Sequence, residues 1–98
     1  MANHSGYALE KLSSAIHYLT VGEGDVRQRL RSAYREFSAV SETDFPPRLQ
    51  DDWKWIMAQL TQYGTIEDTL SRIRNSTGVK IVQRIIYLRD ELESHLER

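Results

Sequence analysis

The chain has 98 residues, of which 40% are hydrophobic and 28% are charged, and it contains two Trp, five Tyr and two Phe. This length fits one domain with one modest core and leaves no room for two domains. The formal net charge of −1 lacks the basic excess of a dedicated nucleic-acid-binding protein, and the absence of cysteine excludes disulfides, thiol catalysis and Cys-ligated zinc.

Residues 1–12 lack the charged and then apolar pattern of a signal peptide, and no apolar run approaches the roughly 20 residues that span a membrane. We therefore expect a cytoplasmic protein without a membrane partner. Between the Gly and Pro clusters, apolar residues recur at helical spacing, and no segment alternates as a half-buried strand would. The sequence therefore predicts one all-α domain over residues 1–98, folded as a compact antiparallel bundle of four to five helices.

The first helix is expected over about residues 6–20, with Ser5 as a candidate N-cap. The second helix is expected over about residues 26–40. Asp25 precedes this helix and Gln28 follows three residues later, which is the spacing of a capping box. Both helices therefore have a predicted start signal.

The third helix is expected over about residues 47–63, because Pro47 suits a first helical turn and Gly64 suits a helix end. A fourth, short helix is expected over residues 66–74, where Thr65 supplies the cap.

The last helix is expected over about residues 79–96. Residues 75–78 before it, Asn-Ser-Thr-Gly, are all weak helix formers. One continuous rod with the fourth helix is an alternative, but we expect a break or kink at this segment.

Trp55 departs from the apolar stripe of the third helix. At about 100° per residue, it lies about 130° from the centre of the stripe that contains Trp53 and Ile56. Three interpretations are open: the third helix is central and packs on two sides, Trp55 is an exposed aromatic anchor, or Trp55 is simply partly exposed. The second is considered because Trp is enriched at interaction hot spots. Trp55 is therefore a candidate partner-binding residue.

The last helix carries more apolar surface than one contact requires, because Val79, Val82 and Ile86 widen its apolar arc. The main stripe has the spacing of a coiled-coil seam. It consists of Ile81, Ile85, Leu88 and Leu92. These four residues are either buried within the monomer or form a two-fold homodimer interface, and we expect the homodimer interface.

Three arginines, Arg27, Arg31 and Arg35, recur every four residues on the second helix and are called the arginine row below. Like charges at this spacing repel, and the helix dipole disfavours a cation at Arg27, in the first turn. Compensation is expected from an acidic protein partner, a phosphate-bearing ligand such as RNA or DNA, or acidic residues of the same chain. The acidic residues considered are Glu36, Asp51, Asp52, Glu91 and Glu93. All three arginines are candidate partner-binding residues.

Nucleic acid would most readily be bound by a helix-turn-helix over residues 65–92. The side chains that its second helix would present are Lys80, Gln83, Arg84 and Tyr87. The residues that would repel a phosphate backbone are Asp90, Glu91, Glu93 and Glu97. A nucleic-acid-associated regulator is therefore the weaker alternative.

No catalytic or metal-binding motif is present. The three histidines, His4, His17 and His95, are far apart in the sequence, and no serine lies in a Gly-x-Ser-x-Gly motif. We expect no catalytic residue, no metal and no cofactor. The sequence predicts a non-enzymatic helical interaction or adaptor module, a homodimer, that binds another protein through its second and third helices.

Overall fold

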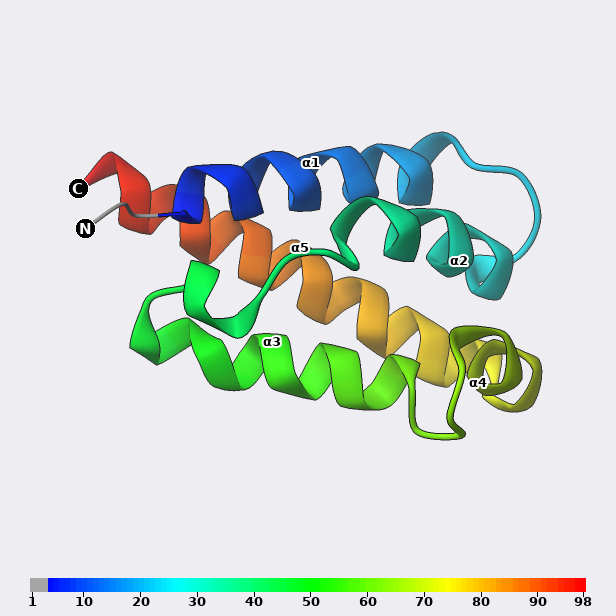
Figure 1. Cartoon of the computed structure of the whole chain (residues 1–98). Coiled ribbons are helices and arrows are strands. Elements are labelled where there is room, and N and C mark those ends of the chain that lie inside the picture. The colour runs from blue at the N-terminus through cyan, green and yellow to red at the C-terminus, as the bar shows by residue number, and fades with distance from the viewer. Residues whose placement is uncertain (1–3) are drawn as a thin grey trace.

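The protein is described by a computed structural model that covers residues 4–98. Its elements in chain order are α1 (Ser5–Val21), α2 (Val26–Phe37), the 3₁₀-helix η1 (Glu42–Asp44), α3 (Pro47–Leu60), α4 (Ile66–Arg72) and α5 (Asn75–Glu97). Figure 1 shows these helices packed as an all-α bundle, which confirms the predicted fold class.

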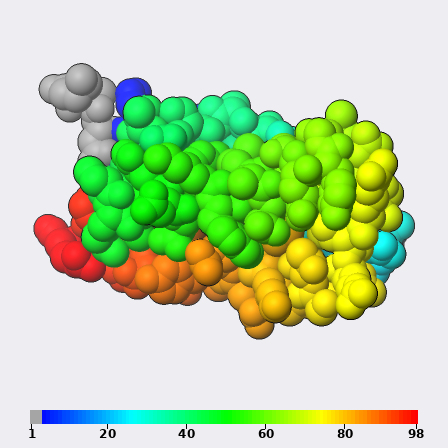
Figure 2. Space-filling view, turned by 90° about the horizontal axis from the view of Figure 1, so that it is seen from below, coloured from blue at the N-terminus to red at the C-terminus, as the bar shows by residue number. Residues whose placement is uncertain are grey.

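Helix α5 occupies the centre of the bundle and packs against α1, α2 and α3. In Figure 1 it runs diagonally behind the other helices, antiparallel to α1, so that α1 begins where α5 ends. Figure 2 shows α3 and α5 lying side by side, with α4 and the start of α5 at one end of the molecule. The other helices are thus assembled around α5.

The core forms because each long helix turns one apolar side inward. Its large side chains with essentially no solvent exposure are Leu12, Leu30, Phe37, Leu49, Ile56, Leu60, Ile81, Ile85, Leu88 and Leu92. Burying a side chain of this size stabilises the fold by about 1.5–3 kcal/mol relative to leaving it exposed. The outer helix surfaces are mostly polar, although some apolar side chains on them, such as Val21, Val79 and Ile86, are exposed. No helix within residues 4–98 has the length and apolarity needed to cross a membrane.

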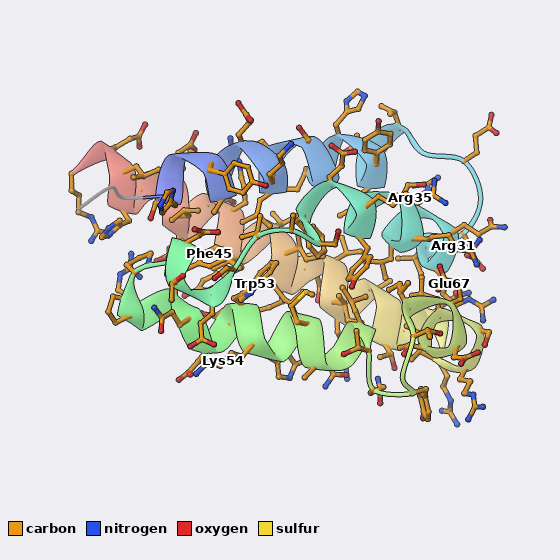
Figure 3. All side chains as sticks on the ribbon, viewed as in Figure 1. Arg31, Arg35, Phe45, Trp53, Lys54 and Glu67 are labelled. Atoms are coloured by element: carbon orange, nitrogen blue, oxygen red, sulfur yellow. The ribbon has the colours of Figure 1, made fainter. Side chains whose placement is uncertain are left out.

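Aromatic side chains fill the space between α2 and α3. Trp53 stacks on Phe45 with ring centroids 5.1 Å apart, and its ring meets Phe37 at 5.6 Å in an edge-on arrangement. Phe37 in turn meets Tyr34 at 5.8 Å. Figure 3 shows Phe45 and Trp53 facing each other between η1 and α3. This cluster ties the connection between α2 and α3 to the core, since such aromatic pairs add stability beyond their buried area.

Two predicted N-caps are confirmed and one is wrong. Asp25 and Gln28 form the predicted capping box, and the Thr65 hydroxyl accepts the Asp68 N–H. Ser5, however, is the first residue of α1 and not its N-cap. Its hydroxyl donates to the carbonyl of Asp44 at 2.9 Å, which joins α1 to η1.

Two predicted helix ends are also wrong. Helix α2 ends at Phe37 and α3 ends at Leu60, so each is three residues shorter than expected. Tyr63 therefore lies outside the helix and is exposed in the turn that Gly64 completes with φ of +102°. A positive φ of this size favours glycine.

Helix α5 begins four residues earlier than expected, although the predicted break between the last two helices is present. The break falls at Ile73 and Arg74, and α5 already begins at Asn75, so the weak helix formers occupy its first turn. Gly78 is buried where α5 approaches α2, and a Cβ at this position would lie 2.9 Å from Val26 Cγ1. The glycine therefore serves close helix packing and does not interrupt the helix.

Gly78→Ala is expected to destabilise the protein by about 1 kcal/mol, since the clash with Val26 outweighs the gain of about 1 kcal/mol in helix propensity. In a Val26→Ala background, which removes the clashing methyl groups, the same substitution should become stabilising. Urea unfolding of the four proteins in this cycle measures the coupling. Equal stabilisation by Gly78→Ala in both backgrounds would show that the packing is not limiting.

Candidate functional site

The first arginine of the arginine row is held by the protein itself. The Arg27 guanidinium forms an ion pair with the Asp25 carboxylate at 3.1 Å and donates to the carbonyl of Ile73 at 3.4 Å. It therefore connects the start of α2 to the segment between α4 and α5. This placement also explains how a cation is tolerated in the first turn, because the capping carboxylate lies beside it.

Asp25 has a pKa lowered from its ordinary value of 3.8. The main cause is the backbone N–H of Gln28, which donates to the Asp25 carboxylate, and the Arg27 guanidinium adds to the effect. Both groups stabilise the ionised form. The start of α2 thus has a fixed negative charge at neutral pH.

Arg31 and Arg35 have no such partner. Both are exposed, and neither forms an ion pair or hydrogen bond with any residue in the described range 4–98. Figure 3 shows both residues on the outer side of α2. Four residues on one helix correspond to a rise of about 6 Å, so the two guanidinium groups extend from neighbouring turns of the same face.

The acidic residues expected to compensate the arginine row within the chain do not do so for Arg31 and Arg35. Three of these acids are paired with other arginines. The pairs are Asp52 with Arg84, Glu91 with Arg48, and Glu93 with Arg89. Within residues 4–98, compensation of the arginine row by the same chain is therefore confirmed for Arg27 alone. Its partner is Asp25, which is not among the acidic residues that the sequence suggested.

A groove of about 370 Å³ lies between α2 and α4, beside the arginine row. Its α2 side is formed by Arg27, Gln28 and Arg31, and its α4 side includes Glu67 and Leu70. Figure 3 shows Arg31 and Glu67 at this end of the bundle. The groove thus combines donors from α2 with one carboxylate and an apolar surface.

Trp55 is half-buried and packs against the core. The guanidinium of Arg84, on α5, lies over its ring at 4.6 Å from the centroid, and Nη1 of the same Arg84 donates to Asp52 at 3.1 Å. Asp52 and Trp55 are three residues apart on α3, so one arginine holds both. The arrangement fastens α3 to α5 and accounts for the position of Trp55 without a partner.

The four residues assigned to a homodimer interface, Ile81, Ile85, Leu88 and Leu92, are each 0% exposed. They face the core of their own chain, because α5 is central and its main stripe is covered by three other helices. That assignment is therefore wrong for these residues. The rest of the wide apolar arc forms a second row, Val79, Val82 and Ile86, which we call the outer row.

The helix-turn-helix layout over residues 65–92 is altered by the same central position of α5. Its second helix is flanked by α1 on one side and α3 on the other, and Arg84 is already engaged by Trp55 and Asp52. A recognition helix must be free to enter a groove of the duplex. This packing therefore weighs against the nucleic-acid alternative.

Some features of the surface could not be predicted from the sequence. The sequence did not show that Arg31 and Arg35 lack an ion pair, although Asp25, two residues before Arg27, was a signal for the pairing of Arg27. The division of α5 into a buried and an outer row was signalled only by the breadth of its apolar arc. Within residues 4–98, no group of three or more His, Asp or Glu side chains is placed to hold a metal ion.

The sequence matches no protein-family model, and no curated protein or solved structure is significantly similar to it. Function must therefore be inferred from the surfaces described above.

Arg84→Met is expected to lower the free energy of unfolding by about 1 kcal/mol, because a partly exposed ion pair and a cation–π contact are both lost. Lys80→Met, an exposed position on the same helix without an ion pair, should change it by less than about 0.5 kcal/mol. In a Trp55→Leu background, the effect of Arg84→Met should shrink by about 0.5 kcal/mol. An unchanged effect would exclude the ring contact as a stabilising interaction.

Asp25→Asn is expected to make stability less dependent on pH in the acid range, while Asn retains a capping side chain. Because the folded-state pKa of Asp25 lies below 3.8, its ionised form stabilises the fold above that pH. This contribution is lost as pH falls through the lowered pKa. Urea unfolding at neutral pH and at successive acidic pH values should show the wild type losing its advantage over the variant. A pH-independent difference would contradict the assignment.

Proposed function

We propose that this protein is a non-enzymatic interaction module that binds an acidic segment of another protein through Arg31 and Arg35 on α2. The observation that carries the proposal is the pair of exposed guanidinium groups, on adjacent turns of one helix face, without an acidic partner among residues 4–98. Placing two cations four residues apart costs a few tenths of a kcal/mol without compensation. A bound carboxylate on each would remove that cost.

The geometry of arginine suits this partner. Each guanidinium presents planar donors that bind a carboxylate in a bidentate manner, and such charge-assisted hydrogen bonds are stronger than neutral ones. Carboxylates spaced by one helical turn in the partner would match the rise of about 6 Å between Arg31 and Arg35. The groove bordered by Arg31 and Leu70 offers room for an apolar side chain beside them.

A protein partner fits the charges better than nucleic acid. The chain carries a net charge of −1, and Glu67 lines the groove next to Arg31. A carboxylate at that position would repel a phosphate backbone, whereas a peptide with its own lysine or arginine would accommodate it. The nucleic-acid alternative is retained as an outcome of the experiment below.

The experiment uses a fluorescein-labelled helical peptide rich in glutamate and measures its binding by anisotropy at low salt. Arg31→Gln/Arg35→Gln is expected to weaken binding about tenfold, since two charge contacts contribute about 1.4 kcal/mol together. The matched control is Arg74→Gln/Lys80→Gln, which removes the same charge from two exposed residues that have no ion pair. The control should bind as the wild type does.

Equal loss in both double variants would show that only net charge attracts the peptide, and the proposal would fail. The same proteins are tested with a mixed-sequence DNA duplex and a single-stranded RNA. Tighter binding to either of these than to the peptide, weakening steeply with salt, would replace the proposal with the nucleic-acid alternative.

A further inference from the structure

The charges along the outer side of α2 change sign beyond Arg31. Arg31 and Arg35 have no ion pair within residues 4–98. The third arginine of the row, Arg27, is already paired with Asp25. On the α4 side of the groove, Glu67 is exposed and has no ion pair in the same part of the chain. Two unpaired cations are therefore followed by an unpaired carboxylate.

The groove lies one helical turn from Arg31. Gln28 and Arg27, which form its α2 side, precede Arg31 by three and four residues. In Figure 3, Arg31 lies between Arg35 and Glu67. A partner helix that lies along α2, with one carboxylate on Arg35 and the next on Arg31, therefore brings its following turn over the groove.

The charge that this following turn meets is negative. Apart from Arg31, the charged residues that line the groove are Asp25, Arg27 and Glu67. Two of them are carboxylates and one is a guanidinium, so their formal net charge is −1. A third carboxylate in the partner would be repelled at this position, whereas a cation would be attracted.

The shape and the apolar wall of the groove suit a long basic side chain. Leu70 lines the groove on the same helix as Glu67 and three residues after it. Lysine and arginine lay their methylene stem along apolar surface and keep the charged group at a polar edge. The groove volume of about 370 Å³ is at the small end of the roughly 300–1,000 Å³ of ligand pockets and is sufficient for such a side chain.

We infer that the partner carries a lysine or arginine one helical turn beyond its two carboxylates, and that Glu67 selects this side chain. The selection rests on the proposed function, because Arg31 and Arg35 must hold the two carboxylates. It adds a register to that function. The partner presents two acidic residues and one basic residue on one helix face, and the basic residue lies at the end that meets α4.

The experiment needs a variant that separates the groove contact from the effect of charge on α4. Glu67 and Asp68 both lie in the first turn of α4, where a carboxylate stabilises the helix through its dipole. Both are exposed, but only Glu67 is among the residues that line the groove. Glu67→Gln is therefore compared with Asp68→Asn, which removes the same charge from the neighbouring position.

The probes are fluorescein-labelled helical peptides with two glutamates four residues apart. In one pair of peptides, lysine or glutamine stands four residues after the second glutamate. In the other pair it stands four residues before the first glutamate, because a helix can lie along α2 in either direction. The ratio of the affinities for the lysine and the glutamine peptide is compared between proteins, which cancels the effect of lysine on the peptide's own helix.

In one of the two pairs, this ratio should be about threefold higher for the wild type than for Glu67→Gln, the effect of one exposed ion pair at low salt. Asp68→Asn should keep the ratio of the wild type, and circular dichroism should show the same helix content in all three proteins.

Equal ratios for the wild type and Glu67→Gln in both pairs would overturn the inference, while peptide binding through Arg31 and Arg35 would stand. An equal decrease in Asp68→Asn would show that the charge of α4 and not the groove contact favours lysine, which would overturn it as well. Failure of every peptide to bind would overturn the proposed function and this selection together.

Discussion

The position of every long helix depends on the burial of α5 side chains between α1, α2 and α3. The side chains at the centre of this contact are Ile81, Ile85 and Leu88. Because α5 packs against three neighbouring helices, the residues on its flanks also contact side chains of those helices. The Arg84 guanidinium lies over the ring of Trp55 on α3, and Gly78 leaves space for the Val26 side chain of α2. The side chains of α5 that stay exposed, among them Lys80, Gln83 and Tyr87, lie where these three neighbours leave the helix uncovered.

The same packing leaves some arginines paired with carboxylates and others without an ion pair. Arg48, Arg84 and Arg89 are paired with carboxylates, two of them across the contact between α3 and α5. These pairs contribute modestly to stability but define how the helices lie against each other. Arg31 and Arg35 lie on the side of α2 that no other helix covers. Because this side of α2 is exposed, both guanidinium groups are accessible from solvent. The functional proposal is therefore based on these two residues.

The sequence allowed prediction of the helices, the capping box at Asp25 and most of the core, because these depend on local chemistry and on the spacing of apolar residues. It did not allow prediction of what Gly78 does, since a glycine at a close helix contact and a glycine at a break look alike in one dimension. Which arginines lack an ion pair could not be predicted for a related reason, because contacts between distant segments are not visible in the sequence. Arg27 is paired with Asp25, two residues before it, and the tertiary fold adds the carbonyl of Ile73, whereas Arg31 has no ion pair among residues 4–98.

The two tryptophans of α3 lie only two residues apart and yet have different surroundings. Trp53 is enclosed by Phe37 and Phe45, whereas Trp55 lies under a guanidinium at the junction with α5. The protein thus contains two tryptophan fluorophores, one in the aromatic interior and one at a charged, half-buried contact between helices. Emission from single-tryptophan versions would separate melting of the interior from loosening of that contact, without any label attached to the chain.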